Sequence, residues 1–168
     1  MAATKSQDAI ALLKEDHRTV EKLFKDFEDA KGEGRKQKLA HQICLELSVH
    51  AAIEEEIFYP ACDGKIKDDL IKEAYVEHDA AKVMIAEISA NEGGDDEFFD
   101  AKVKVLMEEI EHHVEEEEKE LFPEVRKADI DLDTVGEALA ERKKELTAEY
   151  KESGIPKPTL TAMDEVTV

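Results

Sequence analysis

The chain has 168 residues, of which 42% are hydrophobic, and this is enough for one domain with a sizeable core. Its 43 acidic and 23 basic side chains leave a net charge of -20, which repels nucleic-acid phosphates and anionic lipid headgroups. We therefore expect no nucleic acid and no membrane as partners. The sequence contains no apolar run as long as that of a signal peptide or a membrane span, so we expect a cytoplasmic protein.

Clusters of glycine and proline separate segments in which apolar residues recur with helical periodicity. These segments predict four long helices, over residues 7–30, 36–60, 66–90 and 95–122. Because the loops between them are short, neighbouring helices should be antiparallel. The sequence thus predicts an all-α fold, an up-down-up-down four-helix bundle that occupies residues 1–128.

A further helix is expected after the bundle. Thr134 and Glu137 have the spacing of a capping box, which predicts that this helix covers residues 134–151. We expect it to pack on or beside the bundle as a unit of residues 129–152. Residues 153–168 are expected to form a flexible tail.

Two cysteines, Cys44 and Cys62, lie 18 residues apart on or near one predicted helix, which is too far for them to pair within it. We interpret them as free thiols in a reducing compartment, and most simply as small core residues.

The histidines give the most specific signal in the sequence. On the second predicted helix, His50 and Glu54 are four residues apart and therefore point to the same side. The same side carries the apolar residues Ile43, Leu47, Ile53 and Ile57. Glu55 and Glu56 point elsewhere by the same geometry, so the His50–Glu54 pair is expected to face the core.

The fourth predicted helix repeats this arrangement. His50 stands ten residues before Pro60, and His113 stands ten residues before Pro123. In this register the matching carboxylate is Glu117, four residues after His113. The acids expected to lie mostly in solvent are Glu115, Glu116 and Glu118.

The first and third predicted helices supply one histidine each, His17 in "EDHRTV" and His78 in "VEHDAA". The chain thus resolves into two similar helical hairpins, and a pseudo-twofold axis between them would bring four imidazoles and two carboxylates together. Two ionised glutamates are costly to bury without a compensating cation. The pattern therefore predicts a metal site whose ligands are His17, His50, Glu54, His78, His113 and Glu117. Nitrogen and carboxylate donors without a thiolate favour iron, manganese or zinc.

Other polar residues fit the site less well. His41 and His112 lie off the core-facing stripe, and we expect them at the surface or outside the ligand set. Glu21 follows His17 by four residues, but its repeat counterpart is Lys82, so we leave it out. Glu120 is expected to reach solvent near the helix end.

These residues resemble the hemerythrin-like family of HHE cation-binding domains over residues 8–126. Each His-x-x-x-Glu motif closes in "IFYP" or "LFP", as in that family. The resemblance implies a four-helix bundle around a non-haem di-iron centre with an oxo or hydroxo bridge. It also implies that Glu54 and Glu117 bridge two Fe ions while the histidines are terminal ligands; Mn or Zn are possible substitutes.

The sequence departs from the oxygen-carrying members of this family, which have a fifth histidine at the position of Ala74. If both irons are six-coordinate, about one position on each then stays open. Tyr75, three residues before His78, projects near the same face. Its hydroxyl either lies at the edge of the packed core or ligates or hydrogen-bonds a bound oxygen species.

We therefore expect a protein that reacts with O2 or H2O2, and catalase-like peroxide disproportionation is one plausible activity. The alternatives are a reversible O2-binding store, carrier or sensor, an iron-buffering protein, and a metal-free acidic bundle that binds other proteins. Metal content and the reaction with peroxide distinguish these classes.

Overall fold

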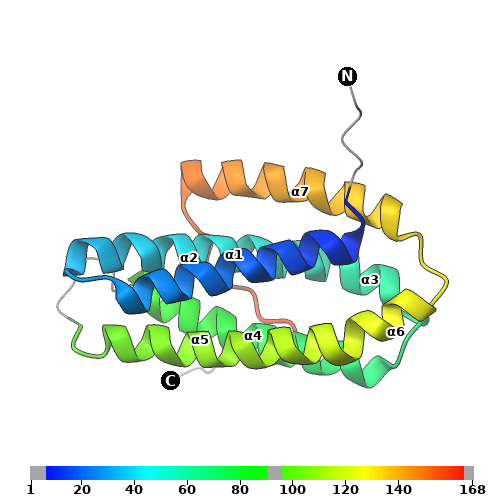
Figure 1. The fold of residues 1–168 in the computed structure, drawn as a ribbon, viewed down its shortest axis with the longest axis horizontal. Coiled ribbons are helices and arrows are strands. Elements are labelled where there is room, and N and C mark those ends of the chain that lie inside the picture. Colours follow the sequence, from blue (N-terminus) through cyan, green and yellow to red (C-terminus); the bar gives the residue numbers. More distant parts are fainter. Residues whose placement is uncertain (1–6, 91–95, 165–168) are drawn as a thin grey trace.

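The computed structural model describes residues 7–90 and 96–164, which form helices and their connections (Figure 1). The elements in chain order are α1 (Ala9–Asp29), α2 (Glu33–Ile53), η1 (Glu54–Phe58), α3 (Tyr59–Cys62), α4 (Asp68–Ala90), α5 (Phe99–Glu116), η2 (Glu117–Leu121), α6 (Phe122–Lys127) and α7 (Leu132–Ser153). The segments η1 and η2 are π-helical turns, so α2 to α3 and α5 to α6 are each one continuous helix.

The bundle predicted from the sequence is confirmed. α1 packs chiefly against α2, and α4 packs chiefly against α5, so two antiparallel hairpins face each other (Figure 1). α7 lies against α1 and α2 on the side away from α4 and α5. None of the described helices is both long and apolar enough to cross a membrane.

The second and fourth bundle helices continue through Pro60 and Pro123, so the predicted ends at residues 60 and 122 are wrong. Each proline stands two residues after the end of a π-helical turn, in which the backbone N–H of Tyr59, for example, bonds to the carbonyl of Glu54 five residues back. In a regular α-helix the proline ring would clash with the carbonyl four residues earlier. The wider π turn accommodates the ring, and the helix goes on.

The last helix begins earlier than the capping-box pattern predicts. Its N-cap is Asp131, whose carboxylate accepts a hydrogen bond from the backbone N–H of Thr134 at 3.2 Å. The Thr134 hydroxyl donates to the same carboxylate at 2.7 Å. Thr134 therefore lies inside the first turn and does not cap it.

α7 reaches the bundle through a close backbone approach at Gly136. A Cβ atom built on Gly136 would lie 2.8 Å from the backbone nitrogen of Ala9 and still closer to the carbonyl oxygen of Gln7. Glycine is thus required where α7 crosses the start of α1.

The apolar core consists of two clusters separated by a polar layer. On α1, Leu13 belongs to one cluster and Val20 to the other, with the buried His17 between them. The two cysteines are both buried, Cys62 in the first cluster and Cys44 in the second. Burial raises the pKa of the Cys62 thiol to about 12, so it stays protonated.

The chain beyond α7 returns across the bundle toward α4 (Figure 1). The buried carboxylate of Asp79 accepts hydrogen bonds from the backbone N–H groups of Thr161, Ala162 and Met163 at 2.6–3.1 Å. Lys82 donates to the carbonyl oxygen of Thr159 at 3.0 Å. Specific hydrogen bonds thus hold the segment 154–164 against α4, which differs from the flexible tail expected from the sequence. Residues 165–168 of that predicted tail lie outside the described residues.

Candidate metal centre

Six side chains from the four bundle helices meet in the polar layer, and each is at most 7% exposed. They are the six that the sequence singled out: His17 on α1, His50 on α2, Glu54 at the start of η1, His78 on α4, His113 on α5 and Glu117 at the start of η2. The four histidines lie on four different helices, so the cluster joins all four.

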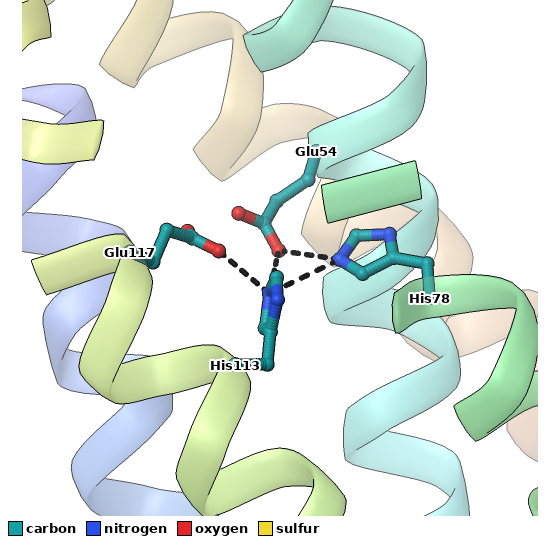
Figure 2. Close-up of side chains that lie close together, drawn as sticks. All are labelled: Glu54, His78, His113 and Glu117. Atoms are coloured by element: carbon teal, nitrogen blue, oxygen red, sulfur yellow. Dashed lines mark hydrogen bonds and ion pairs between the residues drawn. The ribbon is translucent and has the colours of Figure 1, made fainter. Parts of the chain in front are cut away.

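Figure 2 shows four of these residues converging from the second, third and fourth bundle helices. Nε2 of His113 lies 2.6 Å from Oε2 of Glu117. Nε2 of His78 lies 3.3 Å from Oε1 of Glu54 and also 3.3 Å from Nε2 of His113. The donor atoms of all four residues lie within 4.8 Å of one another.

A second group adjoins the first. Nε2 of His50 lies 2.8 Å from Oε1 of Glu54, and Nε2 of His17 lies 3.9 Å from Oε1 of Glu117. Donor atoms of His17, His50 and Glu117 again lie within 4.8 Å of one another. Glu117 thus belongs to both groups, facing one with each oxygen.

The Nδ1 atom of every imidazole in the cluster is held by a carboxylate outside it. The pairs are His17 with Glu118 at 2.9 Å, His50 with Asp16 at 3.0 Å, His78 with Glu55 at 3.1 Å and His113 with Glu77 at 2.9 Å. An ionised carboxylate can only accept, so each Nδ1 carries the proton and donates. In the neutral ring, the lone pair of Nε2 then points to the centre of the cluster.

For two of these four acids, the side of the helix predicted from the sequence is wrong. Glu55 and Glu118 were expected to point away from the core, but their side chains are only 13% and 20% exposed. Each directly follows a cluster glutamate inside a π-helical turn, which advances fewer degrees per residue than an α-helical one. Two consecutive acids therefore reach the same layer.

Several buried atoms at the centre have no hydrogen-bond partner within the described part of the chain. They are Nε2 of His17 and of His50, both carboxylate oxygens of Glu54, and Oε1 of Glu117. An unpaired buried polar group costs about 1–3 kcal/mol, and more if charged. Because the facing atoms are nitrogen and oxygen lone pairs, a cation between them satisfies them together. The donor set therefore fits metal ions.

Without a cation, these groups have opposed pKa shifts. Burial and the nearby charge of His50 lower the pKa of His17 to about 3. Burial disfavours a charge on His50, but the carboxylates of Glu54 and Asp16 outweigh it and raise its pKa to about 10. Burial and the neighbouring Glu54 carboxylate raise the pKa of Glu117 to about 7. Opposed shifts among groups in contact are typical of functional sites.

Tyr59, for which the sequence predicted no role, is fully buried beside the cluster. Its hydroxyl donates to Oε2 of Glu117 at 3.3 Å and lies 3.2 Å from Nε2 of His78. In a straight α-helix Tyr59 would point roughly opposite to His50. The π turn between them rotates Tyr59 toward the side of the helix that faces the cluster. Its position directly before Pro60 in "IFYP" was the available signal.

The matching position of the other hairpin is Phe122, directly before Pro123. Its ring stacks on His17 with centroids 5.9 Å apart and planes within 5°. The ring of Tyr59 lies beside His78 with centroids 5.4 Å apart, but the two planes are tilted by 41° instead of stacked. Both halves of the cluster thus place an aromatic ring at the matching position, and of the two rings Tyr59 alone carries a hydroxyl group.

The remaining candidates lie outside the cluster. Tyr75 packs edge-on against Tyr59, with ring centroids 5.2 Å apart, and within the described contacts it reaches no cluster residue. His112 is 65% exposed and lies near Glu77 and Glu116. The other candidates are His41 and Glu120, which are exposed, and Glu21, which pairs with Arg18.

A family model for the hemerythrin HHE cation-binding domain matches residues 8–125. The chain belongs to this family. A curated relative from Nostoc sp., described as a DNA nickase, is 31% identical over 120 residues, which cover 71% of this chain and 33% of the relative. The chain therefore spans about a third of that relative's length.

A solved structure shares the fold. The crystal structure of a hemerythrin HHE cation-binding domain-containing protein from Mycobacterium kansasii has a TM-score of 0.75 at 23% identity, and the match covers 88% of this chain and 94% of the other. As a hemerythrin HHE domain, the chain is a metal-binding protein, and its buried histidine–glutamate cluster fits that role.

Proposed function

We propose that the chain is a non-haem di-iron protein that reacts with dioxygen or hydrogen peroxide, and that it disproportionates peroxide. The observation that supports this most is the buried layer in which four imidazole nitrogens and two carboxylates face one another, several of their atoms with no hydrogen-bond partner among the described residues. Mixed nitrogen and carboxylate donors suit iron, with manganese and zinc as chemically acceptable substitutes.

The two donor groups suggest how two ions would be held. His17 and His50 would bind one ion, and His78 and His113 would bind the other. Glu117, which faces both groups, would bridge them. Glu54, whose Oε1 lies within 3.3 Å of both His50 and His78, would form the second bridge.

Bound irons would supply the electron transfer needed to break and form oxygen–oxygen bonds. In disproportionation one peroxide molecule is reduced to water while a second is oxidised to dioxygen, so no outside reductant is needed. The apolar clusters on both sides of the layer limit the water that reaches it. Burial and the adjacent Glu117 and Glu54 carboxylates raise the pKa of Tyr59 well above its usual value, so its hydroxyl stays protonated and donates a hydrogen bond beside the centre.

The test compares iron-loaded protein with the double variant Glu54→Ala, Glu117→Ala. Iron per chain and dioxygen released from peroxide are measured on the same samples. We expect two irons and rapid dioxygen release from the native chain, and neither from the variant. The matched control is Glu111→Ala, Glu120→Ala, which removes two exposed acids and should leave both quantities unchanged.

The same experiment distinguishes the alternative functions. Peroxide turnover no faster than that of the Glu54→Ala, Glu117→Ala variant would contradict the proposed activity. Reversible oxygenation of the ferrous protein without progressive oxidation would indicate a carrier or sensor. Tight binding of many more than two irons would indicate iron buffering, and a folded chain without bound metal would indicate an interaction module.

A further inference from the structure

A cavity of about 600 Å³ lies between the cluster and the returning C-terminal segment. All four cluster imidazoles contribute to its lining, and the opposite wall is made by residues of the segment 155–161. The space is far larger than dioxygen or peroxide needs, because a water molecule occupies only about 30 Å³ in the liquid. Its volume falls in the range of sites for small organic molecules, about 300–1,000 Å³.

The walls of the cavity are mainly apolar. They include Val20, Leu47, Ala81, Ile85, Ile110 and Val114 from the bundle. Ile155, Pro156 and Pro158 add apolar surface from the C-terminal segment. Such a lining gains free energy, about 25 cal/mol per Å², when an apolar molecule replaces water against it.

The cavity extends along α4. Ser89, near the end of that helix, contributes to the lining, as does His78. Ser89 follows His78 by eleven residues, which places the two roughly 16 Å apart along the helix axis. The cavity is therefore long, with the histidine cluster at one end and Ser89 at the other.

The negative charge of the chain disfavours anionic ligands in the cavity. The net charge of -20 repels anions, and the cavity wall carries three carboxylates, on Asp16, Glu55 and Glu56, against two ammonium groups, on Lys82 and Lys157. A neutral molecule meets no such barrier.

The geometry points to a second ligand site: the cavity binds a neutral, elongated apolar molecule, such as a medium-chain alcohol, that lies between the histidine cluster and Ser89. This site goes beyond the proposed reaction with oxygen species and does not depend on which metal the cluster holds. The segment 155–161 forms one wall, and hydrogen bonds with Asp79 and Lys82 hold this part of the chain in place.

The test measures binding of 1-octanol to the full-length, metal-characterised protein by calorimetry. Ala86, which lines the cavity, is changed to leucine to fill it, and Ala90, exposed on the same helix, is changed to leucine as the matched control. We expect one octanol per native chain, roughly tenfold or greater weakening in Ala86→Leu, and no change in Ala90→Leu.

Octanoate serves as the charged counterpart and should bind more weakly than octanol. The site is overturned if octanol does not bind, or if Ala86→Leu and Ala90→Leu bind it equally well while both remain folded by circular dichroism. Metal content is determined on the same samples, so a failure of the metal proposal is seen separately from a failure of this one.

Discussion

Oδ2 of Asp16 lies 3.0 Å from Nδ1 of His50, and its Oδ1 lies 2.5 Å from the ammonium group of Lys143 on α7. Asp16 directly precedes His17 on α1. One buried carboxylate therefore orients a histidine of the cluster and connects it to the helix outside the bundle. The equivalent acid of the second hairpin, Glu77, holds His113 but has no such link to α7 among the described contacts.

Asp16→Ala should weaken metal binding by about ten- to hundredfold, because His50 loses the acceptor that fixes its tautomer and orientation. Competition with a chelator, followed by metal analysis, measures this. Lys143→Ala removes the contact to α7 but leaves the Asp16–His50 pair, so it serves as the control. Equal metal loss in both variants would show that the link to α7, not the hydrogen bond to His50, retains the metal.

Tyr59→Phe should leave the metal content unchanged and lower peroxide turnover by roughly tenfold, because the hydrogen-bond donor to Glu117 is lost. Tyr75→Phe is the matched control, since among the described contacts Tyr75 packs on the ring of Tyr59 and reaches no cluster residue. Turnover and metal per chain are measured for both variants. If Tyr59→Phe keeps the full peroxide turnover of the native chain, the hydroxyl group has no role in the reaction and Tyr59 acts through packing alone.

Removal of the metal should lower the melting temperature by roughly 5–10 °C. The cluster joins four helices, and a ligand present at a hundred times its Kd stabilises the folded state by about 2.7 kcal/mol. Calorimetry before and after chelation measures the shift. The Glu54→Ala, Glu117→Ala variant should show no shift on chelation, and an unchanged melting temperature of the native chain would argue that the cluster holds no metal.

Gly136→Ala should destabilise the fold by about 1–3 kcal/mol, because the new Cβ meets the backbone of Gln7 and Ala9. Thermal unfolding measures the change. Gly34→Ala is the control, since a Cβ there meets nothing within 4 Å and alanine favours the helix. That variant should be neutral or slightly more stable, so a loss of stability in both would point to a cause other than the crossing of α7 and α1.

Asp8 predicts a pH-dependent contribution to stability. A hydrogen bond from Arg126, together with the backbone N–H of Ala11, holds the pKa of Asp8 below its usual value. The folded state therefore favours the ionised form. This stability is fully present above the unfolded pKa, near 3.9, and is lost as the pH falls through the lower folded pKa.

Asp8→Asn should accordingly lower stability by about 0.5–1 kcal/mol at neutral pH, where the charge acts as cap and ion-pair partner. The difference from the native chain should shrink as the pH is lowered below the unfolded pKa. Urea unfolding at several pH values measures both. A difference that stays constant across this range would rule out the carboxylate charge as its source.

The sequence was sufficient for the bundle because apolar periodicity and short loops determine helix number and direction. It also singled out the residues that the structure brings together, since the distance to each proline distinguished His113 from His112. Tyr59, Glu55 and Glu118 could not be placed, because a constant α-helical rotation does not apply inside a π turn.

The position of the C-terminal segment could not be predicted from the sequence either. Asp79 interacts with backbone N–H groups of Thr161, Ala162 and Met163, and such groups have no signature in side-chain identity. The local sequence, with its glycine and prolines, resembles a loose tail, so the contacts depend on tertiary structure alone.

The π-helical turns also determine where the bundle tolerates a change of length. Each turn contains one residue more than an α-helical turn, so deleting the exposed Glu56 from η1 would relax it to regular α-helix without rotating the flanking segments. Deleting a residue of α2 before His50 would instead rotate everything beyond it by about 100° relative to the start of the helix and turn His50 away from the other cluster residues. Natural variation in chain length within these helices should therefore concentrate between each cluster glutamate and the proline that follows it.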